Sequence, residues 1–143
     1  MILVSACLLG ENCKYNGGNN KNEAVLKYLE GKEYVAVCPE TFGGLKAPRL
    51  PAEITGNRVT LKDGTDVTDK FIKGAEKTVR MAKEHGATEA ILKESSPSCG
   101  CDTIYDGTFS GTKIKGMGVA AKMLYELGIS VKSEKDLEKE LNG

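Results

Sequence analysis

The sequence has little of what zinc sites and hydrolytic triads are usually built from. It contains one histidine, His85, and no two of its cysteines are spaced as a Cys-x2-Cys pair. Zinc ribbons and fingers rely on such pairs, so no zinc site of that kind is expected. His85 ends a helical pattern, where the helix dipole favours a solvated histidine. Ser95, Ser96 and Ser98 lack a histidine partner, which argues against a serine-hydrolase triad.

The chain also lacks an excess of charge and a long apolar segment. Lys plus Arg total 20 and Asp plus Glu total 20, so no surplus cations favour nucleic acid, and we expect no nucleic-acid partner. No apolar run approaches the roughly 18 residues of a membrane span. The first residues, Met1–Ser5, carry no cationic lead of the kind that begins a signal peptide. We therefore expect a cytoplasmic protein with no membrane partner.

Cysteines are present in an odd number, which argues against a disulfide framework in a reducing compartment. They are Cys7, Cys13, Cys38, Cys99 and Cys101. Buried thiols, metal ligands and redox thiols all remain open for them. The chain of 143 residues, 40% of them apolar, fits one domain over residues 1–143 with a packed core.

Short apolar runs alternate with helical patterns along the chain. Buried strands are predicted at 2–4, 34–37, 89–93 and 129–131. Helices are predicted at 21–30, 66–85, 116–127 and 133–141. A hairpin is predicted at 52–62, with its turn at Thr55-Gly56-Asn57. This order predicts an α/β fold with a parallel, Rossmann-like sheet, flanking helices and one small hairpin.

Three cysteines occupy equivalent places in this pattern. Cys7 follows the first predicted strand, Cys38 the second and Cys99 the third. In an open parallel sheet, the loops after the carboxyl ends of the strands line the ligand crevice, so the three thiols are expected to meet there. Two of the cysteines lie in the segments Cys38-Pro39-Glu40 and Ser95-Ser96-Pro97-Ser98-Cys99-Gly100. Proline fixes φ there, glycine permits close approach of the backbone, and the serine hydroxyl groups can hydrogen-bond to sulfur.

Simpler interpretations stay open at this point. Cysteine is among the most buried residue types, so the three thiols could be ordinary core residues. Gly116-Met117-Gly118-Val119 opens a predicted helix, whose backbone amides could bind an anion. It lacks the full dinucleotide fingerprint, and a tight turn explains the glycines more simply.

Several motifs, in order, resemble those of the thiouracil desulfurase family, and the resemblance covers roughly residues 2–131. Its most specific segments are Ser96-Pro97-Ser98-Cys99-Gly100 and Ile104-Tyr105-Asp106-Gly107-Thr108-Phe109-Ser110-Gly111. The others are Ser5-Ala6-Cys7-Leu8-Leu9-Gly10, Cys13-Lys14-Tyr15-Asn16-Gly17, Cys38-Pro39-Glu40, Gly43-Gly44-Leu45, Pro48-Arg49-Leu50-Pro51-Ala52-Glu53, Asp66-Val67-Thr68, Phe71 and Gly74-Ala75. Asn16 stands where the family more often has aspartate, and asparagine can make the same turn.

The resemblance implies an enzyme with a [4Fe-4S] cluster held by three cysteines, leaving one iron without a protein ligand. It implies conversion of 2-thiouracil to uracil and hydrogen sulfide without a redox change, with the substrate's sulfur bound to the open iron. We assign Cys7, Cys38 and Cys99 as the ligands, because the strand-end argument selects them independently. Cys13 is also a family cysteine and could exchange roles with Cys7, whereas Cys101 lies outside the motif.

The resemblance also implies two catalytic residues. The family's acid/base glutamate falls on Glu40 and its serine on Ser96. Glu40 is two residues from Cys38, so its carboxyl would lie close to the cluster, where partial desolvation can raise its pKa and let it relay protons. Ser96 would orient the substrate or the attacking water.

Two alternatives from other classes remain open. One is a non-catalytic iron–sulfur or sulfur-carrier protein that passes sulfide to a partner. The other is an α/β domain with structural thiols that binds an anionic small molecule at Gly116–Gly118 and holds no iron. The partner that we expect is a small thiolated molecule, and the chain is expected to be a monomer or a weak homodimer.

Overall fold

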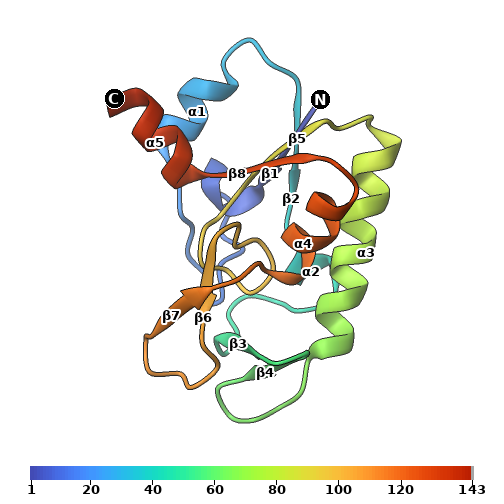
Figure 1. Ribbon diagram of the computed structural model, residues 1–143, viewed down its shortest axis with the longest axis vertical. Coiled ribbons are helices and arrows are strands. Elements are labelled where there is room, and N and C mark those ends of the chain that lie inside the picture. Colours follow the sequence, from blue (N-terminus) through green and yellow to red (C-terminus); the bar gives the residue numbers. More distant parts are fainter. Residues whose placement is uncertain (143) are drawn as a thin grey trace.

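A four-stranded, fully parallel sheet forms the centre of the structure. The computed structural model describes residues 1–142, and the side chains of residues 1–140. The strands lie in the order β2-β1-β5-β8, with the bounds Tyr34–Val37, Ile2–Ser5, Glu89–Leu92 and Ser130–Ser133. Neighbouring strands are all parallel, with Val4 of β1 opposite Ala36 of β2 and Ile91 of β5. The predicted Rossmann-like sheet is confirmed (Figure 1).

Helices flank both faces of this sheet, as predicted (Figure 1). One face carries α3 and α4, and the other carries α1 and α5; their bounds are Thr68–Glu84, Val119–Glu126, Glu23–Leu29 and Glu134–Asn142. Alternate side chains of β1 reach opposite faces. Leu3 packs with Ala82 of α3 and Leu124 of α4, whereas Val4 packs with Val25 of α1. None of the helices within residues 1–142 combines the length and the apolar character that crossing a membrane requires.

The predicted hairpin at 52–62 is present as β3 (Ala52–Thr55) and β4 (Arg58–Leu61), which pair antiparallel. It packs against the first turns of α3, where Val59 and Phe71 share a cluster of buried side chains. The N–H of Val59 donates a hydrogen bond of 2.8 Å to Thr68 Oγ1, which joins the hairpin to the start of the helix. The first residues of β3 thereby form one side of the cavity described below.

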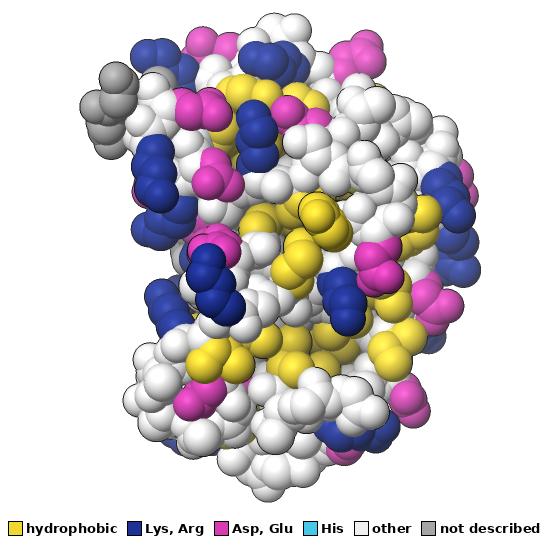
Figure 2. Space-filling view, in the orientation of Figure 1, with side chains coloured by type: hydrophobic (Ala, Val, Ile, Leu, Met, Phe, Trp, Pro, Cys, Tyr) yellow, Lys and Arg dark blue, Asp and Glu magenta, His cyan; other side chains and the backbone are white. Residues whose placement is uncertain are grey.

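Three further elements have no counterpart in the sequence pattern. They are the short helices η1 (Ala6–Leu9) and α2 (Pro39–Phe42) and a second hairpin of β6 (Thr103–Tyr105) and β7 (Lys113–Lys115). The two short helices follow β1 and β2 directly, so each turns the chain at the carboxyl end of a strand. Figure 2 shows Lys and Arg side chains interspersed with Asp and Glu on one face of the molecule, in keeping with a net charge of zero.

The helix predicted at 116–127 begins only at Val119, because the residues before it lie against the loop at 97–102. The N–H groups of Gly118 and Val119 donate to the carbonyls of Gly100 and Pro97, each at 2.9 Å. These amides are therefore occupied, which corrects the interpretation that they could bind an anion. Gly118 is required for this contact, since a Cβ there would lie 2.4 Å from the carbonyl carbon of Ser98.

Candidate functional site

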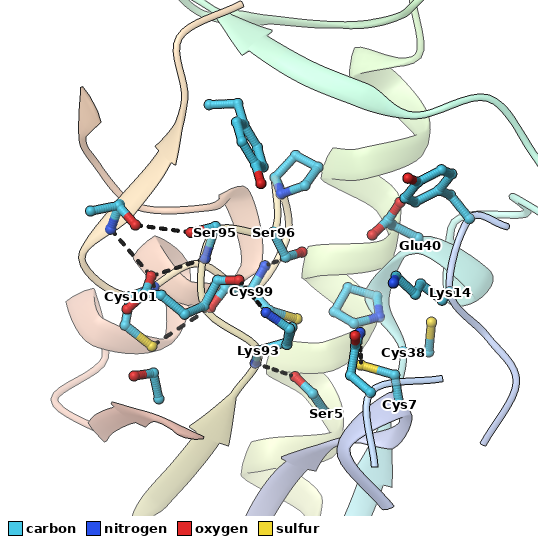
Figure 3. A pocket seen from close by; sticks show the side chains of 18 of the residues that line it. Ser5, Cys7, Lys14, Cys38, Glu40, Lys93, Ser95, Ser96, Cys99 and Cys101 are labelled. Carbon is cyan, nitrogen blue, oxygen red and sulfur yellow. Dashed lines mark hydrogen bonds between the residues drawn. The ribbon is translucent and has the colours of Figure 1, made fainter. Parts of the chain in front are cut away.

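A cavity of about 1170 Å³ opens beside the carboxyl ends of β1, β2 and β5. All five cysteines line it, and so do Glu40 and Ser96. Figure 3 shows Cys7, Cys38 and Cys99 reaching it from separate segments of the chain. The structure therefore brings the residues selected from the sequence to one place, at the end of the sheet where the strand-end argument predicts them.

Cys7, Cys13 and Cys38 form the closest group of thiols. Cys7 lies in η1, immediately after β1, and Cys38 follows β2 as the residue before α2. The Cys13 thiol comes from the loop after η1 and lies close enough to the other two sulfurs to shift their pKa values. Asn20 Nδ2 donates to Cys7 Sγ at 3.5 Å, and Thr41 Oγ1 donates to Cys38 Sγ at 3.2 Å.

The pKa values of the three thiols are shifted in opposite directions, downward for Cys7 and Cys38 and upward for Cys13. The neighbouring Cys13 thiol, acting as a hydrogen-bond donor, lowers the pKa of Cys7 against the opposing effect of burial. The same donor, with help from Thr41, lowers the pKa of Cys38 to about 5. The pKa of Cys13 is raised well beyond its usual range, because its proton serves both neighbours. Both shifts favour the thiolate, which is the form that binds metal, and the shift is large for Cys38.

Cys99 is held by a loop that Ser96 organises. The Ser96 Oγ accepts the N–H groups of Ser98 and Cys99, each at 3.1 Å. Its two lone pairs are then used, so the hydroxyl hydrogen of Ser96 stays available as a donor on the cavity wall. Burial raises the pKa of the Cys99 thiol well above its usual value, opposed by a hydrogen bond from Ser5. A metal bound nearby would be needed to ionise Cys99 at neutral pH.

Glu40 lies at the cavity beside Arg49, a residue that belongs to one of the quoted sequence motifs but had no role predicted for it. Arg49 Nη2 is 3.2 Å from Glu40 Oε1, and it also donates to the Cys13 carbonyl at 3.1 Å. Burial raises the pKa of Glu40, and the charge of Arg49 opposes this rise. The pair therefore joins the carboxyl predicted as acid/base to the loop that carries Cys13.

Cys101 lines the same cavity but stands apart from the other thiols, as Figure 3 shows. Burial and the carboxylate of Glu94 raise the pKa of Cys101. Its amide donates to Glu94 Oε1 at 3.0 Å. Glu94 was not among the residues selected from the sequence. The one signal for it was its place directly after the third predicted strand and directly before the serine motif.

The donor set at this cavity fits an iron–sulfur cluster. Thiolates are soft ligands that select zinc, copper(I) and iron–sulfur clusters. Within residues 1–142, no three His, Cys, Asp or Glu side chains are grouped as the ligands of a single metal ion. A cluster takes its thiolates on separate irons, so its ligands need not converge on one point. Two thiols with lowered pKa values and a third that lines the same cavity suit that arrangement.

Nearly the whole chain is similar to known proteins. The family model for 2-thiouracil desulfurase matches residues 2–136. The uncharacterized protein YbbK of Bacillus subtilis (strain 168) is 46% identical over 147 residues, which cover 96% of this chain and 97% of that protein.

A solved structure described as [4Fe-4S]-dependent thiouracil desulfidase TudS superposes with a TM-score of 0.90 and 42% identity. The superposition covers 96% of this chain and 93% of that one. The resemblance noted in the sequence is thereby confirmed, and the chain belongs to the 2-thiouracil desulfurase family.

Proposed function

We propose that this protein is a [4Fe-4S]-dependent desulfidase that hydrolyses the thiocarbonyl of a thiolated pyrimidine base such as 2-thiouracil. The observation that carries the proposal is the meeting of Cys7, Cys38 and Cys99 with Glu40 around one cavity. Similarity to a protein described as a [4Fe-4S]-dependent thiouracil desulfidase supports both the cofactor and the substrate class.

Cys7, Cys38 and Cys99 are the proposed ligands, one from the segment that follows each of β1, β2 and β5. The Cys13 thiol lies beside two of them and has a raised pKa, which suits a residue that holds a proton beside the ligands. When bound, the cluster would supply a Lewis-acidic iron that polarises the thiocarbonyl of the substrate through its sulfur. The remaining chemistry falls to side chains of this chain.

The overall reaction is that of one water molecule with the thiocarbonyl, which gives a carbonyl and one molecule of hydrogen sulfide. No oxidation state changes, so no electron donor or acceptor is needed. The Glu40 carboxylate takes a proton from the attacking water, whose oxygen forms the new bond to carbon. As the carbon–sulfur bond breaks, the Glu40 carboxyl returns this proton to the departing sulfur. The second proton of the water leaves the new hydroxyl group and reaches the sulfur by way of Glu40, so that a carbonyl and hydrogen sulfide result. The raised pKa of Glu40 brings the carboxyl closer to the working pH that such an acid/base requires.

Ser96 and Arg49 are proposed to place the reacting groups. The Ser96 hydroxyl, which accepts two backbone N–H groups, donates its own hydrogen to the water or to the thiolated base. Arg49 fixes the Glu40 carboxylate through the 3.2 Å ion pair, so the carboxylate keeps one orientation toward the cavity.

The test is anaerobic reconstitution with iron and sulfide, followed by an assay of 2-thiouracil turnover. Cys38→Ala should lose the brown absorption of the cluster and all turnover. Cys101→Ala is the matched control, because its thiol lines the same cavity apart from the others; it should keep both. Absorption without turnover in the wild type would favour the sulfur-carrier alternative. No stable cluster in the wild type would return the three thiols to a structural role.

A further inference from the structure

The carboxylate of Glu94 closes the loop that carries Ser96 and Cys99. Glu94 directly follows Lys93 at the end of β5, and the loop returns to its side chain before β6 begins. A single oxygen, Oε1, accepts four backbone N–H groups: those of Ser95 (3.0 Å), Cys101 (3.0 Å), Asp102 (3.1 Å) and Thr103 (3.2 Å). Hydrogen bonds to an ionised acceptor are the stronger kind, so the two ends of the loop are firmly joined.

The backbone at one end of this loop is strained. Ser95 has a φ of +65°, a left-handed conformation that residues other than glycine rarely adopt. The Ser95 hydroxyl shares a hydrogen bond of 3.0 Å with Thr103 Oγ1. The backbone of Ser95 also forms an isolated parallel β-bridge with Ile104. Strain of this kind persists only where the surroundings fix it, and it is concentrated at functional sites. Here the contacts from Glu94 and Thr103 fix it, next to Ser96.

The positions of Ser96 and Cys99 depend on each other inside the closed loop. Ser96 accepts the amide of Cys99 on its side chain and the amide of Gly100 on its carbonyl, the latter at 2.8 Å. Because Ser96 follows the strained Ser95, any change in the Glu94 contacts is passed to both residues. The loop is thus a single unit with Glu94 as its anchor.

Glu94 is itself fixed to the rest of the fold. Its N–H donates to Glu134 Oε1 at 2.8 Å, and its carbonyl accepts Lys93 Nζ at 2.9 Å. Lys93 Nζ also pairs with Glu134 Oε2 at 3.1 Å, where the Glu134 side chain is 4% exposed. These contacts attach the loop to the start of α5 as well as to the end of β5.

We propose that Glu94 is a positioning residue, whose carboxylate sets the places of Cys99 and Ser96 before cluster or substrate binds. This rests on the proposed function in one respect, since there Cys99 is the third ligand and Ser96 the serine that places substrate or water. Glu94 touches neither and acts through the four amides.

The first test uses cluster-free protein, so it does not depend on the reaction. In Glu94→Ala, backbone hydrogen exchange at residues 101–103 and alkylation of Cys99 should each accelerate at least about tenfold, with exchange in β1 and β2 unchanged. Asp102→Asn is the matched control: its side chain contacts Lys115 at the surface, where the two side chains are 63% and 85% exposed. It should behave as the wild type does. Unchanged exchange and alkylation in Glu94→Ala would overturn the proposal.

The second test uses the conservative variant and the loaded protein. Glu94→Gln keeps an acceptor oxygen at the same reach, so loop protection should recover at least in part. In the loaded Glu94→Ala protein, the electron paramagnetic resonance of the reduced cluster should change, and kcat for 2-thiouracil should fall roughly tenfold to a hundredfold with KM changed less. A spectrum and kcat identical to the wild type would contradict the proposal.

Should Glu94→Ala fail to fold, the wild type and Glu94→Gln still decide. The amides of residues 101–103 should exchange slowly in the cluster-free wild type, although Asp102 is exposed at the surface. Exchange there at the rate of an unstructured chain would overturn the proposal, whether or not the protein turns over 2-thiouracil. If loop protection is found but no thiolated base reacts, only the proposed function fails.

Discussion

Arg49 Nη2 lies 3.2 Å from Glu40 Oε1, in an ion pair whose side chains are only 8% and 17% exposed. The same nitrogen reaches the Cys13 carbonyl, and the buried Nη1 has no hydrogen-bond partner among residues 1–140, whose side chains the structure describes. A guanidinium so enclosed cannot be replaced by an ammonium without losing part of its fixed fork of donors. The pair connects the proposed acid/base to the loop of the fourth family cysteine.

Breaking this pair should be costly. Arg49→Met leaves a buried carboxylate without its cation, and removal of one partner of a buried pair costs about 3–5 kcal/mol. Chemical denaturation of the cluster-free protein at pH 7 measures this loss. Arg58→Met is the control, because its pair with Asp66 is 56% and 42% exposed and should contribute less than about 1 kcal/mol. An equal loss of unfolding free energy in the two variants would show that the buried Arg49–Glu40 pair stabilises the fold no more than an exposed pair does.

The reactivity of Cys38 should have an unusual pH dependence in cluster-free protein. Because its pKa is lowered to about 5, the thiolate is present above that pH. Alkylation followed by peptide mass spectrometry should show a midpoint near pH 5 for Cys38 and a far higher one for Cys99, whose pKa burial raises. Cys13→Ala removes the main stabilising donor, so the midpoint for Cys38 should move upward. A midpoint for wild-type Cys38 at the ordinary pKa of a free thiol would contradict the geometry of the three thiols.

Cys13 should be dispensable for holding iron. In the proposed arrangement it donates hydrogen bonds to Cys7 and Cys38, so Cys13→Ala should keep about four irons per chain after anaerobic reconstitution, as Cys101→Ala should. Iron and acid-labile sulfide analysis measures this directly. If Cys13→Ala loses its iron and Cys7→Ala keeps it, the two cysteines exchange roles in the ligand set.

Gly118 links the start of α4 to the loop that carries Cys99. In Gly118→Ala the new Cβ would lie 2.4 Å from the Ser98 carbonyl carbon, so the loop must shift, at a cost of about 1–3 kcal/mol. Iron content should fall as well, because the shifted segment includes Cys99. Gly18→Ala is the control, since a Cβ there meets only the flexible Asn16 side chain, at 3.1 Å. Wild-type stability and iron content in Gly118→Ala would contradict the role given to this contact.

The sequence was informative where apolar periodicity or a strand end defined the feature. The runs around Val4 and Ile91 predicted the sheet, and the cysteines after them predicted where the thiols meet. The second hairpin was not predictable, because β7 is three residues long and wholly exposed, with Ile114 among its residues. No alternation of buried and exposed positions marks such a strand.

Contacts between side chains across the site were also outside the reach of the sequence. Glu40 and Arg49 are nine positions apart, and only the path of the intervening loop brings them together. The four amides on Glu94 depend on a left-handed Ser95, which no residue preference predicts. The helix expected from 116 began later because Gly118 packs on Ser98, a contact between segments that sequence periodicity does not record.

Water is proposed to replace sulfur without a change of oxidation state, and isotope labelling tests this central claim most directly. Reconstituted protein is incubated anaerobically with 2-thiouracil in water labelled with oxygen-18, with no added reductant or oxidant, and uracil and sulfide are both quantified. We predict repeated turnover, one labelled oxygen atom in each uracil formed and one sulfide released per uracil. Uracil without the label, a requirement for a reductant, or sulfur retained on the protein after a single turnover would contradict the claim.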